Sequence, residues 1–316
     1  MKKLKRYPKE IYIFWLVEFI LGIQLIGPAL LLFFKEWGGL NQTQTQSLQS
    51  WFALWIFLLE IPTGVIGDVH GKKKSVLLGY ILMGMGSVIY TIVPNFYLFL
   101  LSEFIFAAGV AFISGSKEAW MYDIAKKFKL KSRYREIYAT AGALHMAGMI
   151  AGSMLFTLVV PYLSVQQMFR FTVIPSAIAV LLLGIFVKST DGSKKSLKPD
   201  YLGTFKGGIK ILKDSSQLRR IAIYTGILSM TSYFVIWLYQ EALRVISIPK
   251  EQFGTYRIAL LVAEIVAIRL GAYAFKKVKF SKVLLSMSII VGGAYLLGGV
   301  LQNIIGVLLV LIFAGG

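Results

Sequence analysis

Long apolar runs, separated by short polar segments, make up most of the chain. A helix needs about 20 apolar residues to cross the hydrocarbon core of a bilayer. Nine runs come close to this length, and a tenth, residues 304–316, holds only 13 residues. The nine expected helices span about 11–34, 48–67, 75–93, 96–114, 137–160, 169–187, 221–240, 253–275 and 283–301. We therefore predict an all-α transmembrane bundle of about ten helices, with the sequence ending inside the tenth.

Lysine and arginine are concentrated in every second segment between the apolar runs. The segments at 1–10, 72–74, 126–135, 188–220 and 276–282 hold 27 of the 34 basic residues. Basic residues resist translocation and stay on the cytoplasmic side of a membrane. The pattern therefore predicts a multi-pass membrane protein with a cytoplasmic N-terminus, which we expect in a prokaryotic plasma membrane.

Composition agrees with a membrane protein and argues against several other classes. The chain is 57% hydrophobic and 16% charged, whereas soluble proteins contain about 25% charged residues. The net charge of +19 follows from the cytoplasmic segments, so we expect no nucleic-acid partner. With no cysteine and only two histidines, we expect neither thiol chemistry nor a histidine-based metal site, and no cofactor.

A long polar segment divides the chain into two parts. Residues 188–220 carry nine basic and three acidic side chains and include Pro199. We expect residues 1–188 to form an N-terminal six-helix half and residues 189–220 to form a cytoplasmic linker. Residues 221–316 would then form a partial C-terminal half with helices seven to ten.

The segment between the second and third runs has a distinctive pattern. Residues 64–74, here called the signature segment, read G-V-I-G-D-V-H-G-K-K-K. This resembles the signature of major facilitator superfamily transporters: glycine, three residues, aspartate, a basic residue, any residue, glycine, and two basic residues. The matching positions are Gly64, Asp68, Gly71, Lys72 and Lys73. Val69 departs from the pattern, because the family usually has arginine or lysine there.

The resemblance to this superfamily extends along nearly the whole chain. Residues 60–64 read E-I-P-T-G and residues 114–123 read S-G-S-K-E-A-W-M-Y-D, both similar to stretches of one branch of the superfamily. Tyr239-Gln240, at the end of the seventh run, also fits. The resemblance implies two pseudo-repeat halves of six helices each, of which helices 11, 12 and most of 10 lie beyond this sequence.

The same resemblance implies a cytoplasmic gate. In the family, the signature aspartate and basic residues hold the gate shut when the protein faces outward. Asp68 is then expected near the start of helix 11, where a negative charge meets the positive helix terminus, and Asp123 is expected to pair with Lys72. The expected gate residues are Gly64, Asp68, Gly71, Lys72, Lys73 and Asp123.

Ionisable side chains inside apolar runs are candidates for the substrate and proton path, because a charge in lipid costs several kcal/mol. Glu18 and Glu103 lie in the first and fourth helices, which line the central cavity in the family. Either acid could bind a cation, carry a coupling proton or pair with Arg257. Arg257 and Glu264 are seven residues apart and share a helix face. Tyr239 is a further candidate for the cavity.

These features predict a secondary active transporter that moves a small solute by alternating access, with coupling to protons through Glu103 or Glu18. The expected partners are the solute, protons and the lipid bilayer. The fourth helix lacks the arginine, and the fifth the glycine-proline pair, that are typical of drug/proton antiporters, which weakens that particular assignment.

Two other classes of protein remain as alternatives. The first is a non-transporting fragment or scaffold, suggested by the stop at Gly316. The second is an integral-membrane enzyme, which would need a paired acidic or histidine site near a membrane surface, usually on a sizeable soluble loop. The segment 188–220 is basic and too short for such a site, so we expect no enzyme.

Overall fold

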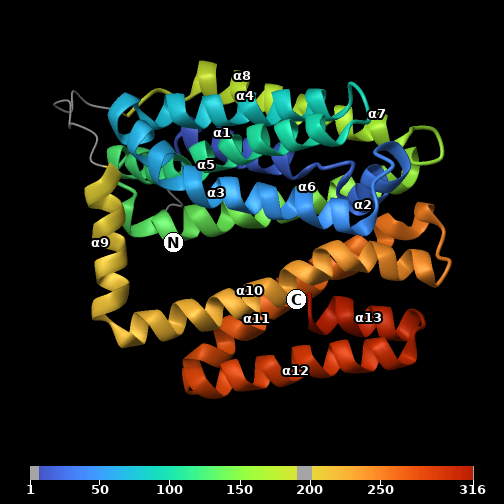
Figure 1. The fold of residues 1–316 in the computed structure, drawn as a ribbon. Helices are drawn as coiled ribbons and strands as arrows, with labels where there is room; N and C mark the ends of the chain where they lie inside the picture. The colour runs from blue at the N-terminus through green and yellow to red at the C-terminus, as the bar shows by residue number, and fades with distance from the viewer. Residues whose placement is uncertain (1–6, 191–200, 316) are drawn as a thin grey trace, which may run out of the picture. The chain divides into compact units, whose positions relative to one another are not determined.

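A computed structural model describes residues 7–190 and 201–315, and every regular element in these residues is a helix (Figure 1). The expected all-helical class is therefore confirmed. Within the expected cytoplasmic segments, residues 1–6 and 191–200 lie outside the described residues.

The number of spanning helices was expected to be about ten. Six segments of the described chain are long and apolar enough to cross a membrane. They are Lys9–Trp37, Gln42–His70, Phe96–Lys127, Lys131–Val159, Val165–Phe186 and Lys282–Leu301. The expected count is thus not confirmed, although the multi-pass character of the chain is clear.

The helices before the linker are bounded as follows. They are α1 (Lys9–Gly22), η1 (Gly27–Ala29), α2 (Leu30–Leu32), η2 (Phe33–Trp37), α3 (Gln42–His70), α4 (Lys72–Tyr90), α5 (Phe96–Lys127), η3 (Lys131–Arg133), α6 (Tyr134–Val159), α7 (Val165–Arg170) and α8 (Val173–Phe186). Those that follow are α9 (Tyr201–Asp214), α10 (Ser216–Val245), η4 (Lys250–Gln252), α11 (Phe253–Lys277), α12 (Phe280–Leu301) and α13 (Ile304–Phe313).

The first expected helix, 11–34, is broken near its middle. The α-helix ends at Gly22, and a 3₁₀ turn begins only at Gly27. Pro28 explains the break, because proline donates no backbone hydrogen bond and its ring clashes with the carbonyl four residues earlier. The backbone groups released by the break need partners elsewhere in the protein.

Two other helices are longer than the apolar runs indicate. The second starts at Gln42 rather than near 48, because Asn41 and Gln44 form a capping box that satisfies its first backbone donors. The fourth continues past Ser114 to Lys127, so Lys117 and Asp123 lie within α5. The expected sixth helix is divided into α7 and α8, and Pro175 lies in the first turn of α8, where proline is tolerated.

Contacts between residues divide the chain into two compact units. The first unit contains Met1–Ile26, Phe33–Gly152 and Ser164–Gly208. Within it α5 packs against both α3 and α4, and α8 packs against α1 and α4 (Figure 1). A cluster of buried aromatic rings fills one end of this unit, with Phe33 stacked on Phe169 at 4.4 Å.

One glycine pair, Gly22 and Gly148, brings α1 and α6 into close contact within the first unit. A Cβ atom on Gly148 would lie 2.1 Å from the backbone oxygen of Phe19, and one on Gly22 would lie 2.2 Å from that of His145. Glycine permits this approach because it has no side chain, as is common between membrane helices. The crossing fixes α6 against α1 where α1 ends.

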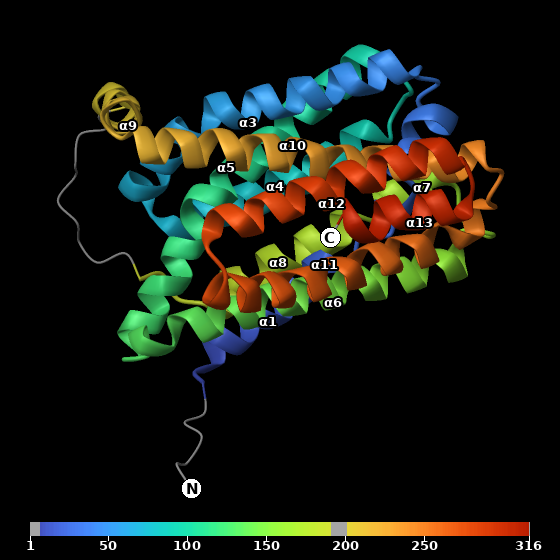
Figure 2. The same ribbon diagram turned by 90° about the horizontal axis from the view of Figure 1, so that it is seen from below.

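The second unit contains Gly27–Leu32, Ser153–Leu163 and Ile209–Gly316. Within it α13 packs against α10, α11 and α12, and Figure 2 shows α12 and α13 side by side. The short segment Gly27–Leu32, which follows the break in the first helix, contacts α10 and α11. This unit therefore includes residues from the beginning of the chain.

Candidate functional site

The signature segment is a corner between two helices rather than an open loop. α3 ends at His70 and α4 begins at Lys72, so Gly71 alone makes the turn. Gly71 has a φ of 105°, a conformation that costs glycine little and other residues more. Gly71 therefore sets the angle between the end of α3, which carries Asp68, and the start of α4, which carries Lys72 and Lys73.

The lysines of this corner reach specific partners within the first unit. Lys72 Nζ lies 2.5 Å from Asp123 Oδ2 on α5, so the expected pair is formed. Lys73 Nζ donates a hydrogen bond to the backbone oxygen of Gly184 on α8 at 2.7 Å. Asp68 is exposed near the end of α3. The corner thus ties α4 to α5 and α8.

Ser75, which follows the signature segment, and Ser116, in the stretch 114–123, form a small polar contact that the sequence did not indicate. Ser116 Oγ donates to Ser75 Oγ at 2.9 Å, and Ser75 Oγ donates to the backbone oxygen of Phe112 at 2.9 Å. A Cβ atom on Gly67 would collide with Ser116 Oγ. The small residues near 64–67 and 114–116 could have predicted this contact from the sequence, because small residues allow α3, α4 and α5 to approach closely.

We expect Lys72 and Asp123 to be energetically coupled. The reversals Lys72→Asp and Asp123→Lys should each lower thermal stability in detergent, and the double swap should recover part of the loss. The coupling should be about 1 kcal/mol, because the pair is partly exposed. Lys74→Asp, at an exposed neighbouring position, is the matched control. Strictly additive effects of the two reversals would contradict the coupling.

Glu18 is held by two side chains from other helices of the first unit. Lys117 Nζ on α5 lies 2.8 Å from Glu18 Oε1, and His145 Nδ1 on α6 lies 3.4 Å from Glu18 Oε2. The Glu18 side chain is 9% exposed, so the carboxyl group is buried inside this cluster. The sequence did not indicate Lys117 as a partner because the apolar run ends before it, and it gave no signal that His145 lies close to Glu18.

Glu103 lies in a different environment on the same helix as Lys117. Its Oε1 accepts a hydrogen bond from Gln49 Nε2 on α3 at 3.0 Å. The buried hydroxyl of Tyr90 on α4 interacts with the same carboxyl group, without a hydrogen bond of standard geometry. Among the described residues, no lysine, arginine or histidine pairs with Glu103. The carboxyl group is thus surrounded by neutral polar groups.

The two acidic sites are well separated. Lys117 follows Glu103 by 14 residues on α5, which corresponds to about 21 Å along the helix axis at 1.5 Å per residue. Glu103 lies near the Phe96 end of α5, whereas the Glu18 cluster lies nearer the Lys127 end. The first unit therefore presents two ionisable sites at different depths.

In the second unit, Tyr239 and Gln240 bind the segment that follows the break in the first helix. The Tyr239 hydroxyl donates to the Pro28 backbone oxygen at 3.2 Å, and Gln240 Oε1 accepts from the Leu31 backbone N–H at 2.8 Å. Gln240 Nε2 also donates to the Gly27 backbone oxygen at 3.5 Å. These side chains replace hydrogen bonds that a continuous helix would make.

Arg257 and Glu264 are also found in the second unit, on α11. Arg257 is buried and interacts electrostatically with both Glu264 and Tyr239. The two charged side chains are therefore near one another, in agreement with their spacing of seven residues. Together with Tyr239 they form a small polar group in an otherwise apolar region.

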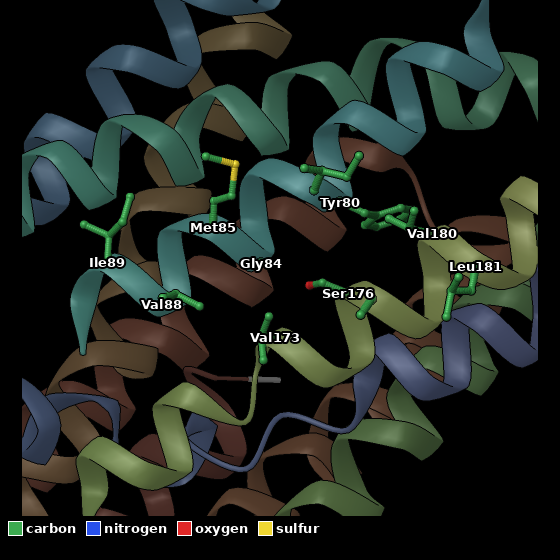
Figure 3. Close-up of a pocket in the computed structure, with 11 residues that line it drawn as sticks. Tyr80, Gly84, Met85, Val88, Ile89, Val173, Ser176, Val180 and Leu181 are labelled. Carbon is green, nitrogen blue, oxygen red and sulfur yellow. The ribbon is translucent and has the colours of Figure 1, made fainter. Parts of the chain in front are cut away.

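A groove between α4 and α8 is lined almost entirely by apolar side chains (Figure 3). Its volume is about 590 Å³, and Ser176 supplies its main polar atom. Ser176 Oγ donates back to the Thr172 backbone oxygen on its own helix. Because a solute site needs several convergent polar groups, this groove is a weaker candidate than the clusters around Glu18 and Glu103.

Long apolar helices that bury charged and hydrogen-bonded side chains between them define an integral, multi-pass membrane protein. The sequence profile of the Major Facilitator Superfamily matches residues 16–316, and the chain belongs to this family. An uncharacterised MFS-type transporter of Methanocaldococcus jannaschii, MJ1560, is 26% identical over 135 residues, which are 42% of this chain. The aligned part is 34% of that relative, about a third of its length.

Solved structures of transporters share the fold at low sequence identity. A bacterial homologue of the human lysosomal transporter Spinster, in an inward-facing and occupied conformation, gives a TM-score of 0.67 at 12% identity, covering 96% of this chain and 71% of that chain. The human organic anion transporter MFSD10 has a TM-score of 0.61 at 16% identity, and the match covers 98% of this chain and 84% of that chain. The Escherichia coli fucose:proton symporter FucP has a TM-score of 0.55 at 17% identity, and the match covers 97% of this chain and 80% of that chain.

Proposed function

We propose that the protein is a secondary active transporter that moves a small solute by alternating access and couples this movement to protons. The N-terminus would face the cytoplasm of a prokaryotic cell, as the distribution of basic residues predicts. Support for proton coupling comes from the environment of Glu103, and the presence of a fucose:proton symporter among the structural neighbours is consistent with it.

The observation that carries the proposal is the neutral environment of Glu103. An ionised carboxylate buried without a cationic partner costs several kcal/mol, whereas a protonated carboxyl group can both donate and accept hydrogen bonds. Gln49 and Tyr90 supply such neutral partners. Glu103 is therefore suited to hold a proton while it is buried and to release it when a conformational change exposes it to water.

The remaining predicted residues receive roles that follow from this function. Lys72, Lys73 and Asp123, with Asp68 and the glycines Gly64 and Gly71, would form a cytoplasmic gate that opens and closes with each cycle. Glu18, Arg257, Glu264 and Tyr239 would contribute to the substrate and proton path. Support comes from the ion pair at the corner and from the burial of Glu18, Arg257 and Tyr239 within apolar helices.

The function is tested by proton movement in proteoliposomes. The natural full-length protein is reconstituted with a pH-sensitive dye inside, and amines, sugars and organic anions are added in turn. At least one class should produce solute-dependent proton movement. In Glu103→Gln this movement should fall well below that of the wild type, because the amide cannot exchange a proton, while exchange of labelled for unlabelled solute continues.

Glu36→Gln, at an exposed position, is the matched control and should behave like the wild type. Proton movement that persists in Glu103→Gln and disappears in Glu18→Gln would transfer the coupling role to Glu18. Persistence in both variants would overturn coupling through either acid. Absence of movement of every solute by the wild type would overturn the assignment as a transporter.

A further inference from the structure

The cluster around Glu18 exposes its lysine and histidine side chains and buries its carboxyl group. The side chains of Lys117 and His145 are 28% and 33% exposed, whereas Glu18 is 9% exposed. The three residues come from α5, α6 and α1, so the cluster is held by three separate helices of one unit. A molecule that reaches the cluster therefore meets an ammonium group and an imidazole first.

The other ionisable groups near the cluster do not provide a second partner for Lys117. Glu118 is adjacent in sequence, but neighbouring helical residues point in different directions, and its Oε1 accepts from the Tyr138 hydroxyl at 2.6 Å. Tyr80 of α4 is buried and interacts electrostatically with Glu18. α8, which also packs against α1, has no titratable residue between Val173 and Phe186.

A lysine within a membrane helix requires an anionic partner, because an unpaired charge costs several kcal/mol. In this structure Glu18 is that partner. We propose that the transported solute carries a carboxylate or an equivalent anionic group, and that this group replaces Glu18 on Lys117, with His145 as a second hydrogen-bond donor. This inference rests on the proposed transport function and adds the chemical class of its substrate.

The replacement has a defined consequence for charge. Once it is displaced, the Glu18 carboxylate would be buried without its partner, so it takes up a proton from water and becomes neutral. One anionic group and one proton therefore enter the site together, with no change in its net charge. Transport of a monoanion by this route is electroneutral if no further ion accompanies it.

The anion site is tested without transport by restoring the missing carboxylate. Glu18→Ala removes the carboxyl group and leaves space beside Lys117. Purified protein in detergent should melt at a lower temperature than the wild type, and formate or acetate should raise its Tm by roughly 3–6 °C when present at ~10 times their Kd. Formamide and acetamide, which have the same shape without the charge, should have no effect.

The double variant Lys117→Met/Glu18→Ala separates a specific site from a general effect of salt. It contains neither charge, so it is expected to fold and to show no response to formate. An equal response of both variants, or an equal effect of formate and formamide on Glu18→Ala, would overturn the anion site. If Glu18→Ala does not fold, Glu18→Gln is used with the same additives, and its failure to respond would also overturn the site.

A second measurement addresses the substrate class itself. Uptake into proteoliposomes is compared for benzoate, benzamide and benzylamine and for other matched acid, amide and amine sets. Acids alone should be transported, and Lys117→Met should reduce their uptake to background. Uptake of amines in place of acids would overturn the anionic class while leaving the transport function intact. If none of the acids, amides and amines is taken up although anions still bind, the result would instead count against the transport function.

Discussion

Gly148→Ala should lower the thermal stability of the protein more than any other single methyl group added to α6. The new Cβ atom would lie 2.1 Å from the backbone oxygen of Phe19 and 2.9 Å from Gly22 Cα. Backbone atoms cannot rotate away as side chains can, so α1 and α6 must separate along the whole crossing. The expected loss is about 3 kcal/mol, which corresponds to a fall in Tm of roughly 6–12 °C.

Gly142→Ala provides the matched control on the same helix. A Cβ atom at Gly142 has no neighbouring atom within 4 Å, so the substitution adds a methyl group in open space. It should leave the Tm unchanged or raise it slightly, since alanine favours helix more than glycine does. Both variants are followed by thermal melting and by the fraction that remains monodisperse in detergent. Equal effects of the two would contradict the close crossing of α1 and α6.

Lys117→Met should destabilise the protein by about 3 kcal/mol, because it leaves a buried carboxylate without its closest partner. Methionine has a length similar to that of lysine, so the loss reflects charge more than packing. His145, at 3.4 Å from Glu18, retains part of the interaction, which places the expected loss at the low end of the range for broken buried pairs.

The double variant Lys117→Met/Glu18→Gln gives the opposite expectation. Removing the second charge eliminates the unpaired carboxylate, so the Tm should return to within a few degrees of the wild type. The measurement is thermal melting of the wild type, both single variants and the double variant at one pH. If the double variant is as unstable as the sum of the two single variants, the pair makes no coupled contribution to stability.

Much of the fold follows from the pattern of apolar runs, because the length and periodicity of a run are local properties. The break in the first helix was not predicted, although Pro28 was evident, because the apolar pattern continues through it. Similarly, the end of the run near Ser114 concealed the continuation of α5 to Lys127. Hydrophobicity indicates what lies in the membrane but not where a helix ends.

The candidate sites were predictable to different degrees for a physical reason. Lys72 and Asp123 could be paired from the sequence because the resemblance to the family covers both positions, one in the signature segment and one in the stretch 114–123. The partner of Glu18 could not, because Lys117 lies on another helix and is brought near only by the crossing of α1 and α5. Gln49 and Glu103, 54 residues apart, meet for the same reason. Such contacts depend on how helices are rotated about their axes, which a single sequence does not specify.

The segment Gly27–Leu32 has a consequence for how this chain could be divided. Its backbone oxygens and the Leu31 N–H are the hydrogen-bond partners of Tyr239 and Gln240, more than 200 positions later in the sequence. A separately synthesised C-terminal polypeptide would therefore expose two polar side chains with no backbone to bind. If the protein is produced as two co-expressed fragments, the N-terminal fragment must be present before the C-terminal fragment completes its packing. The two fragments therefore do not fold independently.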